Sequence, residues 1–585
     1  MSGICGYVGQ PPAETLAQML GANPWRGDAT DTWLGEGIAL GYRWWRGRPG
    51  KSPAIYAGLS GQRMACAGTL APFVDNPAAV LHETLKSHEF STLDGAFAAA
   101  QWDANSKTLT LLRDPFGVRS LYYLQHQNVF YFATEIKQLL AVPGIPADLD
   151  LIAIHKYLSF SFVPGEDTPI KGIRRLLPGH ILRFADNKIT IERYFELKEV
   201  ADPQLDEQAE AARFVRREGL AAVRRRLNGE SEVGLFLSGG LDSSAVAVWL
   251  KEAGANVRAF TLDFGEASLE KAQAESVAQV LGIPLQAIPL DGSELLHLME
   301  QLVHRLDLPF GDAVTGPLYL LNRAAKQAGL TAVFNGEGGD QLFGGWTSKP
   351  MVAAAIYSGV VDDDDDSHEE QYLRSYHRFY GFEEQLYAPA FLAQITPGQR
   401  RALLQPHLNS ASVHGFLNRV RLTDISLKGS QNILPRAERV SNAWGVDMRV
   451  PLFDRALAEA SFRIPASLKL HGACEKYVLK LALQNKLPEE IVWRRKFGMG
   501  VPITDWLLGR KGQSTPGTLS TILNDVLSDA AIERRGLLQS AFVAKLRSGI
   551  DEAGETRRRR VGEKLWALLM LELWLRIFVD HRGQL

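Results

Sequence analysis

Cysteine is scarce in this chain. The 585 residues include only Cys5, Cys66 and Cys474, and no Cys-x-x-Cys or Cys/His metal spacing occurs. A disulfide framework and a cysteine-based metal centre are therefore excluded. Long hydrophobic runs are also missing, since none reaches the roughly 20 residues that span a bilayer, and no signal peptide opens the chain. We therefore expect a cytoplasmic protein that does not insert into a membrane.

Neither sign of charge is in excess. The chain has 64 Lys and Arg against 66 Asp and Glu, so its net charge of −2 provides no general attraction for nucleic acid. A hydrophobic content of 46% indicates a globular protein, and the length allows two or three domains. One local excess exists: Asp362–Asp366 is a run of five acids, which we interpret as a solvated or disordered loop rather than a metal site.

The distribution of apolar residues changes along the chain. Residues 1–195 contain short apolar or alternating runs separated by turns, which is typical of a β-rich fold. A charged helical segment follows, and we expect its Arg224–Arg226 to form a solvated face. From Glu232 onward, apolar strands alternate with helical segments, which predicts a parallel α/β sheet. The remainder of the chain has a mostly helical pattern.

The loop Ser238–Ser244, with the sequence SGGLDSS, carries the strongest functional signal. It follows the apolar run Val233–Leu237 and precedes the helical run Ala245–Leu250. A strand, a glycine turn and a helix N-terminus present free N–H groups and a positive dipole end to an anion. Asp242 would repel a bare phosphate, so it favours a Mg²⁺ ion that bridges to phosphates. The loop lacks the Gly-Lys-Ser/Thr element of a Walker loop and resembles the pyrophosphate loop of ATP pyrophosphatases.

A second glycine-rich loop follows another predicted strand. Five glycines surround Glu337 and Asp340 within residues 335–345, directly after the apolar run Thr331–Phe334. Glycine lets backbone approach a ligand, and ligands gather at the carboxyl ends of strands in open α/β sheets. We therefore expect this loop to face the first one. Asp242 and Asp340 would share a magnesium ion, and Glu337 would lie near the reacting carbonyl as an acid, base or orienting group.

Together these motifs resemble those of the asparagine synthetase superfamily. Its synthetase domain carries S-G-G-x-D-S, G-E-G-x-D, W-G-V-E-x-R-V-P-x-x-D and an E-K motif. The counterparts, in the same order, are Ser238–Ser243, Gly336–Asp340, Trp444–Asp454 and Glu475–Lys480. The second motif has one extra glycine, and Asp447 replaces the Glu of the third. With the N-terminal half, the resemblance covers nearly the whole chain.

The resemblance implies roles for individual residues. Asp242 and Asp340 would hold Mg²⁺ with pyrophosphate, Lys476 would stabilise charge that develops on phosphate and oxyanion, and Glu337 would lie at the acyl centre. The residues implied to contact ATP or pyrophosphate are Leu237, Ser238, Gly239, Gly240, Asp242, Ser243, Leu262 and Gly336. Arg449 and Arg494–Lys496 are weaker candidates for the site, because surface charge or a structural salt bridge explains these residues at least as well as a functional role. The helical tail Leu565–Trp574 would serve packing.

The resemblance also implies the fold and the reaction. Residues 1–195 would form a glutaminase-like domain, an α+β sandwich of the N-terminal-nucleophile-hydrolase type. Residues 205–585 would form an asparagine-synthetase-like α/β ATP-pyrophosphatase domain, of the adenine nucleotide alpha hydrolase type, with a helical C-terminal part. The expected activity is that of a carbon–nitrogen ligase that uses ATP and Mg²⁺ and releases AMP and pyrophosphate.

The N-terminal half departs from the family at its glutaminase residues. The family opens M-C-G-I, and the cysteine, freed at the amino terminus, attacks glutamine. Here Ser2 occupies that position, and Cys5 lies within the first predicted strand. A serine hydroxyl is far less acidic than a thiol. Ala67 stands where the family has its oxyanion asparagine, whereas Arg43 is a candidate for the arginine that binds the glutamine carboxylate. We therefore expect this domain to be inactive as a glutaminase.

An inactive glutaminase implies that the amine arrives with the substrate. Two branches of the superfamily work in this way: the β-lactam and carbapenam synthetases, and the lasso-peptide cyclases, which join an α-amine to an Asp or Glu side chain. The β-lactam branch has Tyr where this chain has Glu337. Glu337, Gly41–Arg46 and Tyr157–Gly165 resemble the lasso cyclases more closely.

This branch implies a linear precursor (core) peptide as substrate and an isopeptide macrolactam as product. It also implies a leader-peptide-removing protease and a leader-binding protein as partners. Two alternatives stay open: an ammonia-dependent asparagine synthetase, and a β-lactam or carbapenam synthetase. A non-catalytic scaffold would have lost residues of the Ser238–Ser244 loop, and none is missing.

Overall fold

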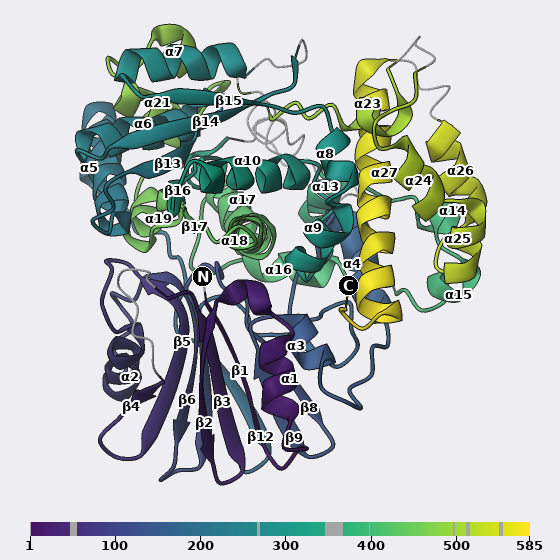
Figure 1. Ribbon diagram of the computed structural model, residues 1–585. Helices are drawn as coiled ribbons and strands as arrows, with labels where there is room; N and C mark the ends of the chain where they lie inside the picture. Colours follow the sequence, from purple (N-terminus) through teal and green to yellow (C-terminus); the bar gives the residue numbers. More distant parts are fainter. Residues whose placement is uncertain are drawn as a thin grey trace.

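The computed structural model describes residues 2–46, 55–265, 270–345, 367–396, 398–494, 496, 498–510, 515–548 and 554–584. Figure 1 shows two stacked parts, a β-sandwich formed by the N-terminal residues and a larger part with a sheet and many helices. Both chain ends lie near the junction between them. The acidic run Asp362–Asp366 lies outside the described residues.

Two antiparallel sheets pack face to face in the N-terminal domain. The first has the order β10 (Arg174–Arg175), β8 (Tyr122–His126), β9 (Val129–Ala133), β1 (Ser2–Val8), β3 (Ile38–Trp44), β2 (Ala29–Gly35). The second has the order β12 (Lys188–Arg193), β11 (His180–Ala185), β7 (Thr108–Arg113), β6 (Gly95–Asp103), β5 (Gln62–Leu70), β4 (Tyr56–Ala57). Side chains at alternate strand positions, such as Ile4, Leu40, Ala98 and Leu111, fill the space between the sheets.

Helices cover both outer faces of this sandwich. Helices α1 (Thr15–Gly21) and α3 (Ile136–Leu140) lie on the first sheet, and α2 (Pro77–Ser87) lies on the second (Figure 1). The side chain of Asn76 accepts a hydrogen bond from the backbone N–H of Ala79, and proline at the first position suits the start of α2. The helix–sheet–sheet–helix layering confirms the predicted α+β sandwich.

Five parallel strands form the centre of the second domain. Their order is β15 (Leu285–Pro289), β14 (Val257–Asp263), β13 (Val233–Phe236), β16 (Ala332–Phe334), β17 (Asp447–Arg449). Both β13 and β16 are buried along their whole length, as expected for strands covered on both faces. The predicted parallel α/β sheet is confirmed. The W-G-V-D-M-R-V-P motif supplies its last strand.

Helices flank this sheet and make up most of the rest of the chain. The helices next to the sheet and the site are α5 (Gln208–Arg226), α6 (Leu241–Glu252), α7 (Lys271–Leu281), α10 (Thr315–Gln327), α11 (Gly339–Phe343), the π-helix η4 (Asp424–Ile433), α18 (Leu434–Asn442), α21 (Tyr477–Leu483) and α22 (Glu489–Val492). The more distant ones include α13 (His368–Arg374), α16 (Arg401–Leu408), α17 (Phe416–Thr423), α23 (Ile503–Leu508), α24 (Ser520–Val526), α25 (Asp529–Arg535) and α26 (Ser540–Ser548).

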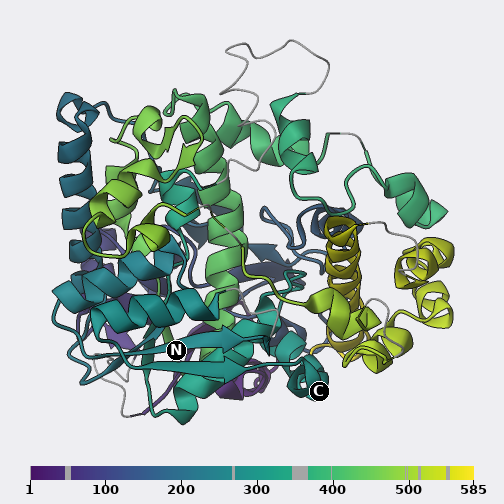
Figure 2. The same ribbon diagram turned by 90° about the horizontal axis from the view of Figure 1, so that it is seen from above.

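The C-terminal helix α27 (Glu555–Leu575) packs inside the helical part. In Figures 1 and 2 it stands between the sheet and the outer helices α24–α26. Its residues from Leu565 to Leu575 are buried, and the indole N–H of Trp574 donates to the carbonyl of Asp307 at 3.2 Å. The predicted packing role is confirmed. None of the described helices is both long and apolar enough to cross a bilayer.

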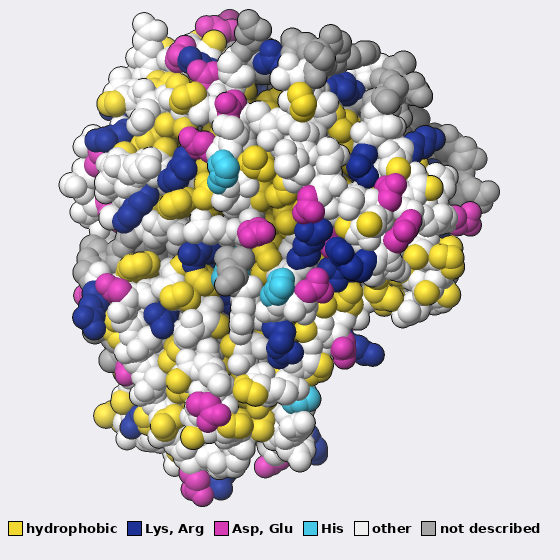
Figure 3. Space-filling view, turned by 45° about the vertical axis from the view of Figure 1, so that its right-hand side comes forward, with side chains coloured by type: hydrophobic (Ala, Val, Ile, Leu, Met, Phe, Trp, Pro, Cys, Tyr) yellow, Lys and Arg dark blue, Asp and Glu magenta, His cyan; other side chains and the backbone are white. Residues whose placement is uncertain are grey.

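The predicted solvated face at Arg224–Arg226 is wrong for two of its three residues. Arg225 and Arg226 both form ion pairs with Asp454, and Arg226 also contacts Asp94 of the N-terminal domain at 2.9 Å. Arg224 alone is exposed. The C-terminal end of α5 lies at the junction of the two domains, so its arginines meet carboxylates that are distant in the sequence. Elsewhere, charges of both signs mix with hydrophobic side chains on the face shown in Figure 3.

A buried network of charges joins the two domains. Each of its side chains is at most 6% exposed: Arg26, Arg119, Glu135 and Lys137 of the sandwich, and Asp307, Glu438 and Arg439 of the second domain. Burial alone would raise the pKa of Glu438, but the guanidinium groups of Arg26 and Arg119 outweigh it and hold this pKa at about 2. The carboxylate therefore stays ionised inside the junction.

We expect Glu438→Gln to lower the free energy of unfolding by about 3–5 kcal/mol at neutral pH, because a buried ion pair loses one partner. Since the pKa of Glu438 is lower in the folded state, its contribution is present above pH 4.5 and is lost as the pH falls through about 2. Urea denaturation at several pH values measures both effects. Glu192→Gln, which breaks an exposed pair with Arg183, is the control and should change little. Equal stability of Glu438→Gln and wild type would contradict the expectation.

Candidate active site

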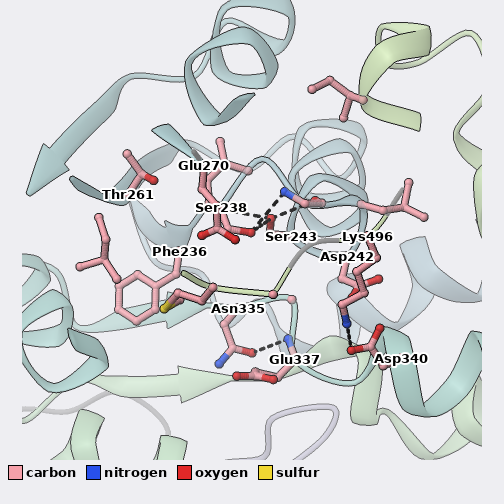
Figure 4. A pocket seen from close by; sticks show the side chains of 18 of the residues that line it. Phe236, Ser238, Asp242, Ser243, Thr261, Glu270, Asn335, Glu337, Asp340 and Lys496 are labelled. Atoms are coloured by element: carbon pink, nitrogen blue, oxygen red, sulfur yellow. Dashed lines mark hydrogen bonds and ion pairs between the residues drawn. The ribbon is translucent and has the colours of Figure 1, made fainter. Parts of the chain in front are cut away.

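A cavity of about 240 Å³ opens at the carboxyl ends of β13, β14 and β16 (Figure 4). Ten of the residues predicted from the sequence line it: Leu237, Ser238, Gly240, Asp242, Ser243, Leu262, Gly336, Glu337, Asp340 and Lys476. They come from four segments that are far apart in the sequence. The expectation that the two glycine-rich loops face each other is confirmed. Gly239 is predicted to contact ATP but does not belong to the lining.

The first loop directs the N-terminus of α6 toward the cavity. Gly240 is the residue before the first turn of α6, so free backbone N–H groups of that turn lie at the cavity. The hydroxyl oxygens of Ser238 and Ser243 are 3.2 Å apart, and the backbone N–H of Gly240 donates to the hydroxyl of Ser238. These hydrogen bonds stabilise the conformation of the loop. Ser244 is fully buried and is not part of the lining.

Glycine lets the two loops touch. A Cβ atom at Gly336 would lie 2.4 Å from the backbone nitrogen of Ser243, and one at Gly339 would lie 2.1 Å from Oδ1 of Asp242. Gly239 has a φ of +67°, and a Cβ there would lie 2.5 Å from the backbone nitrogen of Ala274 on α7. Gly239 therefore serves the packing of the loop on α7, whereas the glycines of the second loop bring its carboxylates to the first.

Two carboxylates and two lysines meet at one end of the cavity. The Lys476 ammonium lies 2.5 Å from Oδ2 of Asp242 and 2.6 Å from Oδ1 of Asp340. Lys496 forms an ion pair with the other oxygen of Asp340. Lys476 stands between the hairpin strand β19 (Cys474–Glu475) and α21 with a φ of +53°. A non-glycine residue in this backbone region stores about 1–3 kcal/mol of strain.

Asp242 and Asp340 have the chemistry of a magnesium site. Oδ1 of Asp242 is buried and accepts no hydrogen bond from the described residues. A buried carboxylate oxygen without a donor is costly, and Mg²⁺ prefers oxygen ligands. The residues therefore fit the ion: Asp242 and Asp340 would hold it, and it would offset the charge of bound phosphates.

Glu337 lies at another edge of the cavity (Figure 4). Its side chain is 32% exposed, and its Oε1 is 3.6 Å from a guanidinium nitrogen of Arg436 on α18. Arg436 in turn binds Asp312 at 2.7 Å. The backbone N–H of Glu337 donates to the side chain of Asn335. Arg436 orients the Glu337 carboxylate and leaves it accessible. A group that accepts or donates a proton at the acyl centre must be accessible in this way.

Several lining residues were not identified from the sequence. Those of apolar character are Phe236, Phe260, Leu318, Leu321, Ile491 and Met499, which suit a purine base. Glu270 also lines the cavity; its burial raises the pKa to about 7, although Arg494 and Lys496 oppose the shift. These residues belong to no recognisable motif, because ordinary core residues have the same spacing.

The basic candidates separate into two groups. Arg449 does not line the cavity: it is buried on β17 and pairs with Glu230 and Asp447, so its role is structural. Arg494 and Lys496 do line the cavity. Arg495 lies outside the described residues.

The residues at the counterpart of the glutaminase centre are buried in the N-terminal domain. Ser2 begins β1 and is 1% exposed, and its hydroxyl accepts a hydrogen bond from the backbone N–H of Gly68 at 3.0 Å. Ala67 is fully buried. Cys5 is also fully buried, and burial raises the pKa of its thiol. The guanidinium of Arg43 donates to the carbonyl of Gly27. Position 2 thus offers a hydroxyl in place of a thiol, and position 67 offers no side-chain donor.

Comparison with known proteins identifies the family. The asparagine synthase family matches residues 215–576, and the glutamine amidotransferase domain family matches residues 75–195. Asparagine synthetase [glutamine-hydrolyzing] 1 of Bacillus subtilis is 26% identical over 85% of this chain and 80% of its own length. A putative asparagine synthetase [glutamine-hydrolyzing] of Mycobacterium bovis is 27% identical over 84% of this chain and 77% of its own length. The asparagine synthase family uses ATP with Mg²⁺. The chain has an N-terminal glutamine amidotransferase domain, and its ligase domain follows in the sequence. It therefore belongs to the asparagine synthase family and is an ATP-dependent carbon–nitrogen ligase that forms AMP and pyrophosphate.

Proposed function

We propose that this ligase closes a macrolactam in a linear precursor peptide by joining the peptide's α-amine to one of its own Asp or Glu side chains. The observation that carries the proposal is the combination of a ligase cavity lined by the motif residues with an N-terminal domain that has Ser2 and Ala67 in place of a cysteine nucleophile and an oxyanion asparagine. Without ammonia from glutamine, the amine comes either with the substrate or from free ammonia, and a substrate-borne amine is the basis of this proposal. A leader-removing protease and a leader-binding protein would be the partners of such an enzyme.

The residues of the cavity support two successive steps. In the first, an oxygen of the substrate carboxylate attacks the α-phosphorus of ATP and pyrophosphate leaves, while Lys476 neutralises charge on the phosphates. In the second, the amine attacks the activated carbonyl carbon, its proton passes to Glu337, and AMP leaves with the carboxylate oxygen. A tethered amine needs no second substrate, so correct positioning supplies much of the rate.

The proposal is tested by mass spectrometry of linear peptides with a free N-terminus and an internal Asp or Glu, incubated with the full chain and Mg-ATP. We expect loss of one water and an isopeptide bond between the α-amine and the acidic side chain. A parallel tube contains aspartate, ammonia and Mg-ATP. Asparagine in that tube, together with no dehydrated peptide in the first, would overturn the proposal.

An ammonia-dependent asparagine synthetase is the second candidate. The relatives named asparagine synthetase favour it, because they align with most of this chain. It differs from the cyclase in both substrates, since it would join free ammonia to free aspartate, and comparison of the two tubes decides between them. The β-lactam and carbapenam synthetases are favoured less, since a carboxylate, Glu337, stands at the cavity edge where that branch has Tyr.

We expect the Ser2→Cys variant to release no glutamate from glutamine above background. A thiol at position 2 would restore only the nucleophile, while Ala67 still provides no side-chain donor for an oxyanion. Glutamate is measured after incubation with glutamine, for the variant and for the wild-type chain. Release by the wild type would contradict the inactive-domain part of the proposal, and release by the variant alone would show that the oxyanion site survived.

We expect Glu337→Gln to slow amide formation more than adenylation. Glutamine keeps the size of the side chain and its place beside Arg436, but it cannot accept a proton from the amine. The two steps are separated by measuring pyrophosphate release and product formation in one reaction, so that the variant releases pyrophosphate without a matching yield of amide. Equal slowing of both signals would assign Glu337 to the ATP step instead.

A further inference from the structure

We infer that a small inorganic anion, such as chloride, binds inside the buried charge network at the domain junction and accepts hydrogen bonds from Tyr122 and from arginines beside it. The residues that would hold the anion are Tyr122, Arg119, Arg175 and Arg439, called the Tyr122 site below. The anion would act as a structural ligand that stabilises the junction. The inference involves neither ATP nor an amine and is independent of the proposed function.

Tyr122 lies between two of these arginines. On one side, Tyr122 of β8 is the cross-strand partner of Arg175 of β10, and the side chains of such a pair project from the same face of a sheet. On the other side, Tyr122 is paired with Ala133 of β9. The guanidinium of Arg439 donates to the carbonyl of Thr134, the residue after Ala133. The site therefore combines one sheet of the sandwich with α18 of the second domain.

Each member of the Tyr122 site has a donor atom that no described residue accepts from. The four side chains belong to residues that are at most 4% exposed. The donor atoms are the hydroxyl of Tyr122, Nη1 of Arg175, Nε of Arg119 and Nε of Arg439. Buried donors in proteins are almost always satisfied by protein groups, water or a bound ion. Donors that surround one side chain, three of them on guanidinium groups, favour a single acceptor with a negative charge.

The network around Tyr122 also contains more positive than negative charge. Six buried cations stand against four buried anions, namely Arg26, Arg113, Arg119, Lys137, Arg175 and Arg439 against Asp114, Glu135, Asp307 and Glu438. Arg113 and Arg175 account for the excess, because they donate to carbonyls and to an amide and form no ion pair within the described part of the chain. The carboxylate of Asp167 also attracts Arg175, but it pairs with Lys156 at 2.6 Å.

The arginines of the network repel one another. Burial and the nearby charges of Arg175 and Arg439 lower the pKa of Arg113 to about 10, against the attraction of Asp114. Burial also lowers the pKa of Arg175, and Arg439 adds to that shift. A pKa of about 10 leaves Arg113 charged at neutral pH, so the excess of positive charge persists. Because an uncompensated buried charge is costly, an anion among these groups would stabilise the folded chain.

Bromide can locate such a site by crystallography, because it replaces chloride and scatters anomalously at an accessible X-ray energy. Crystals of the full chain are soaked in sodium bromide, and anomalous difference density is calculated. We expect a peak within hydrogen-bonding distance of the Tyr122 hydroxyl and of a guanidinium nitrogen of Arg175 or Arg439. Density for water at this place, with no anomalous peak, would overturn the inference, and so would peaks only at exposed positions.

Tyr122→Phe tests the site in solution, because it removes the hydroxyl and keeps the ring. Thermal unfolding of the full chain is followed while chloride replaces gluconate at a constant sodium concentration. For the wild type we expect the midpoint temperature to rise with chloride and to level off as the site fills. For Tyr122→Phe we expect half of this rise to require about tenfold more chloride, since a hydrogen bond to a charged group is lost.

The matched control is Tyr131→Phe on the neighbouring strand β9, where the ring packs against Tyr7. It should respond to chloride as the wild type does. A wild type without a chloride response would contradict the inference. An equal response of wild type and Tyr122→Phe would do the same, since general salt effects act on every variant alike. If Tyr122→Phe does not fold, the bromide experiment on the wild type decides. Neither experiment contains ATP or a peptide, so its failure leaves the proposed function intact.

Discussion

We expect the Asp242→Ala variant to release no detectable pyrophosphate from ATP while it keeps its fold. The substitution removes the ion pair between Lys476 and Oδ2 of Asp242. It also removes Oδ1 of Asp242, a buried oxygen that accepts no hydrogen bond from the described residues. Loss of one preorganised charge in such a site commonly costs about 10²–10³ in rate, and loss of half a metal site should cost more. Asp242 lies in the first turn of α6, where alanine is compatible with the helix.

Pyrophosphate release by a coupled assay and thermal unfolding by circular dichroism check this expectation together. Asp242→Asn is the matched variant, because it keeps the shape of the side chain and removes only its charge. Both variants should be inactive and should unfold close to the wild-type temperature. An active Asp242→Asn would show that the carboxylate is not a metal ligand, and ADP as the wild-type product would contradict the pyrophosphatase reaction itself.

The second large effect is expected for Lys476→Ala, which should lose on the order of 10² or more in kcat. Its ammonium bridges Asp242 and Asp340, and it is the most buried cation beside both carboxylates, with 4% of its side chain exposed. If Lys476 stabilises charge that develops during the reaction, raising the ATP concentration does not restore the rate.

Steady-state rates over a range of ATP concentrations separate kcat from KM for this variant. Lys251→Ala, a change in the last turn of α6 outside the cavity lining, is the control and should behave as the wild type. A variant whose only defect is a raised KM would assign Lys476 to ground-state ATP binding. A variant that fails to fold would instead indicate that Lys476 mainly separates two repelling carboxylates.

The sequence predicted most of the cavity because its chemistry is concentrated in short segments. Glycine-rich loops directly after buried strands place Asp242, Glu337 and Asp340 at one edge of a parallel sheet, whatever the rest of the fold. The two loops are in close contact in the structure because Gly336 and Gly339 have no side chains, and these glycines belong to the same motif. The apolar wall and Glu270 could not be predicted, since core residues and helix-end acids occur throughout any α/β domain.

The ion-pair partners of individual charged side chains were harder to predict than the positions of the loops. Arg226 meets Asp94 and Asp454, which are more than a hundred residues away in the sequence. Arg449 meets Glu230 in the same manner. A run of charged residues is solvated unless the fold places an oppositely charged partner beside it. Such a partner cannot be identified from the sequence when it comes from a distant part of the chain. The burial of Ser2 likewise depends on contacts such as that with Gly68, which lies on another strand.

If this chain activates a carboxylate by adenylation, one oxygen atom of that carboxylate passes to AMP, and an oxygen isotope can follow the transfer. A substrate whose carboxylate carries ¹⁸O is incubated with the full chain and Mg-ATP, and the nucleotide product is analysed by mass spectrometry. We expect AMP that has gained one ¹⁸O from the carboxylate and pyrophosphate that has gained none. Unlabelled AMP, or ADP with the label in inorganic phosphate, would contradict it.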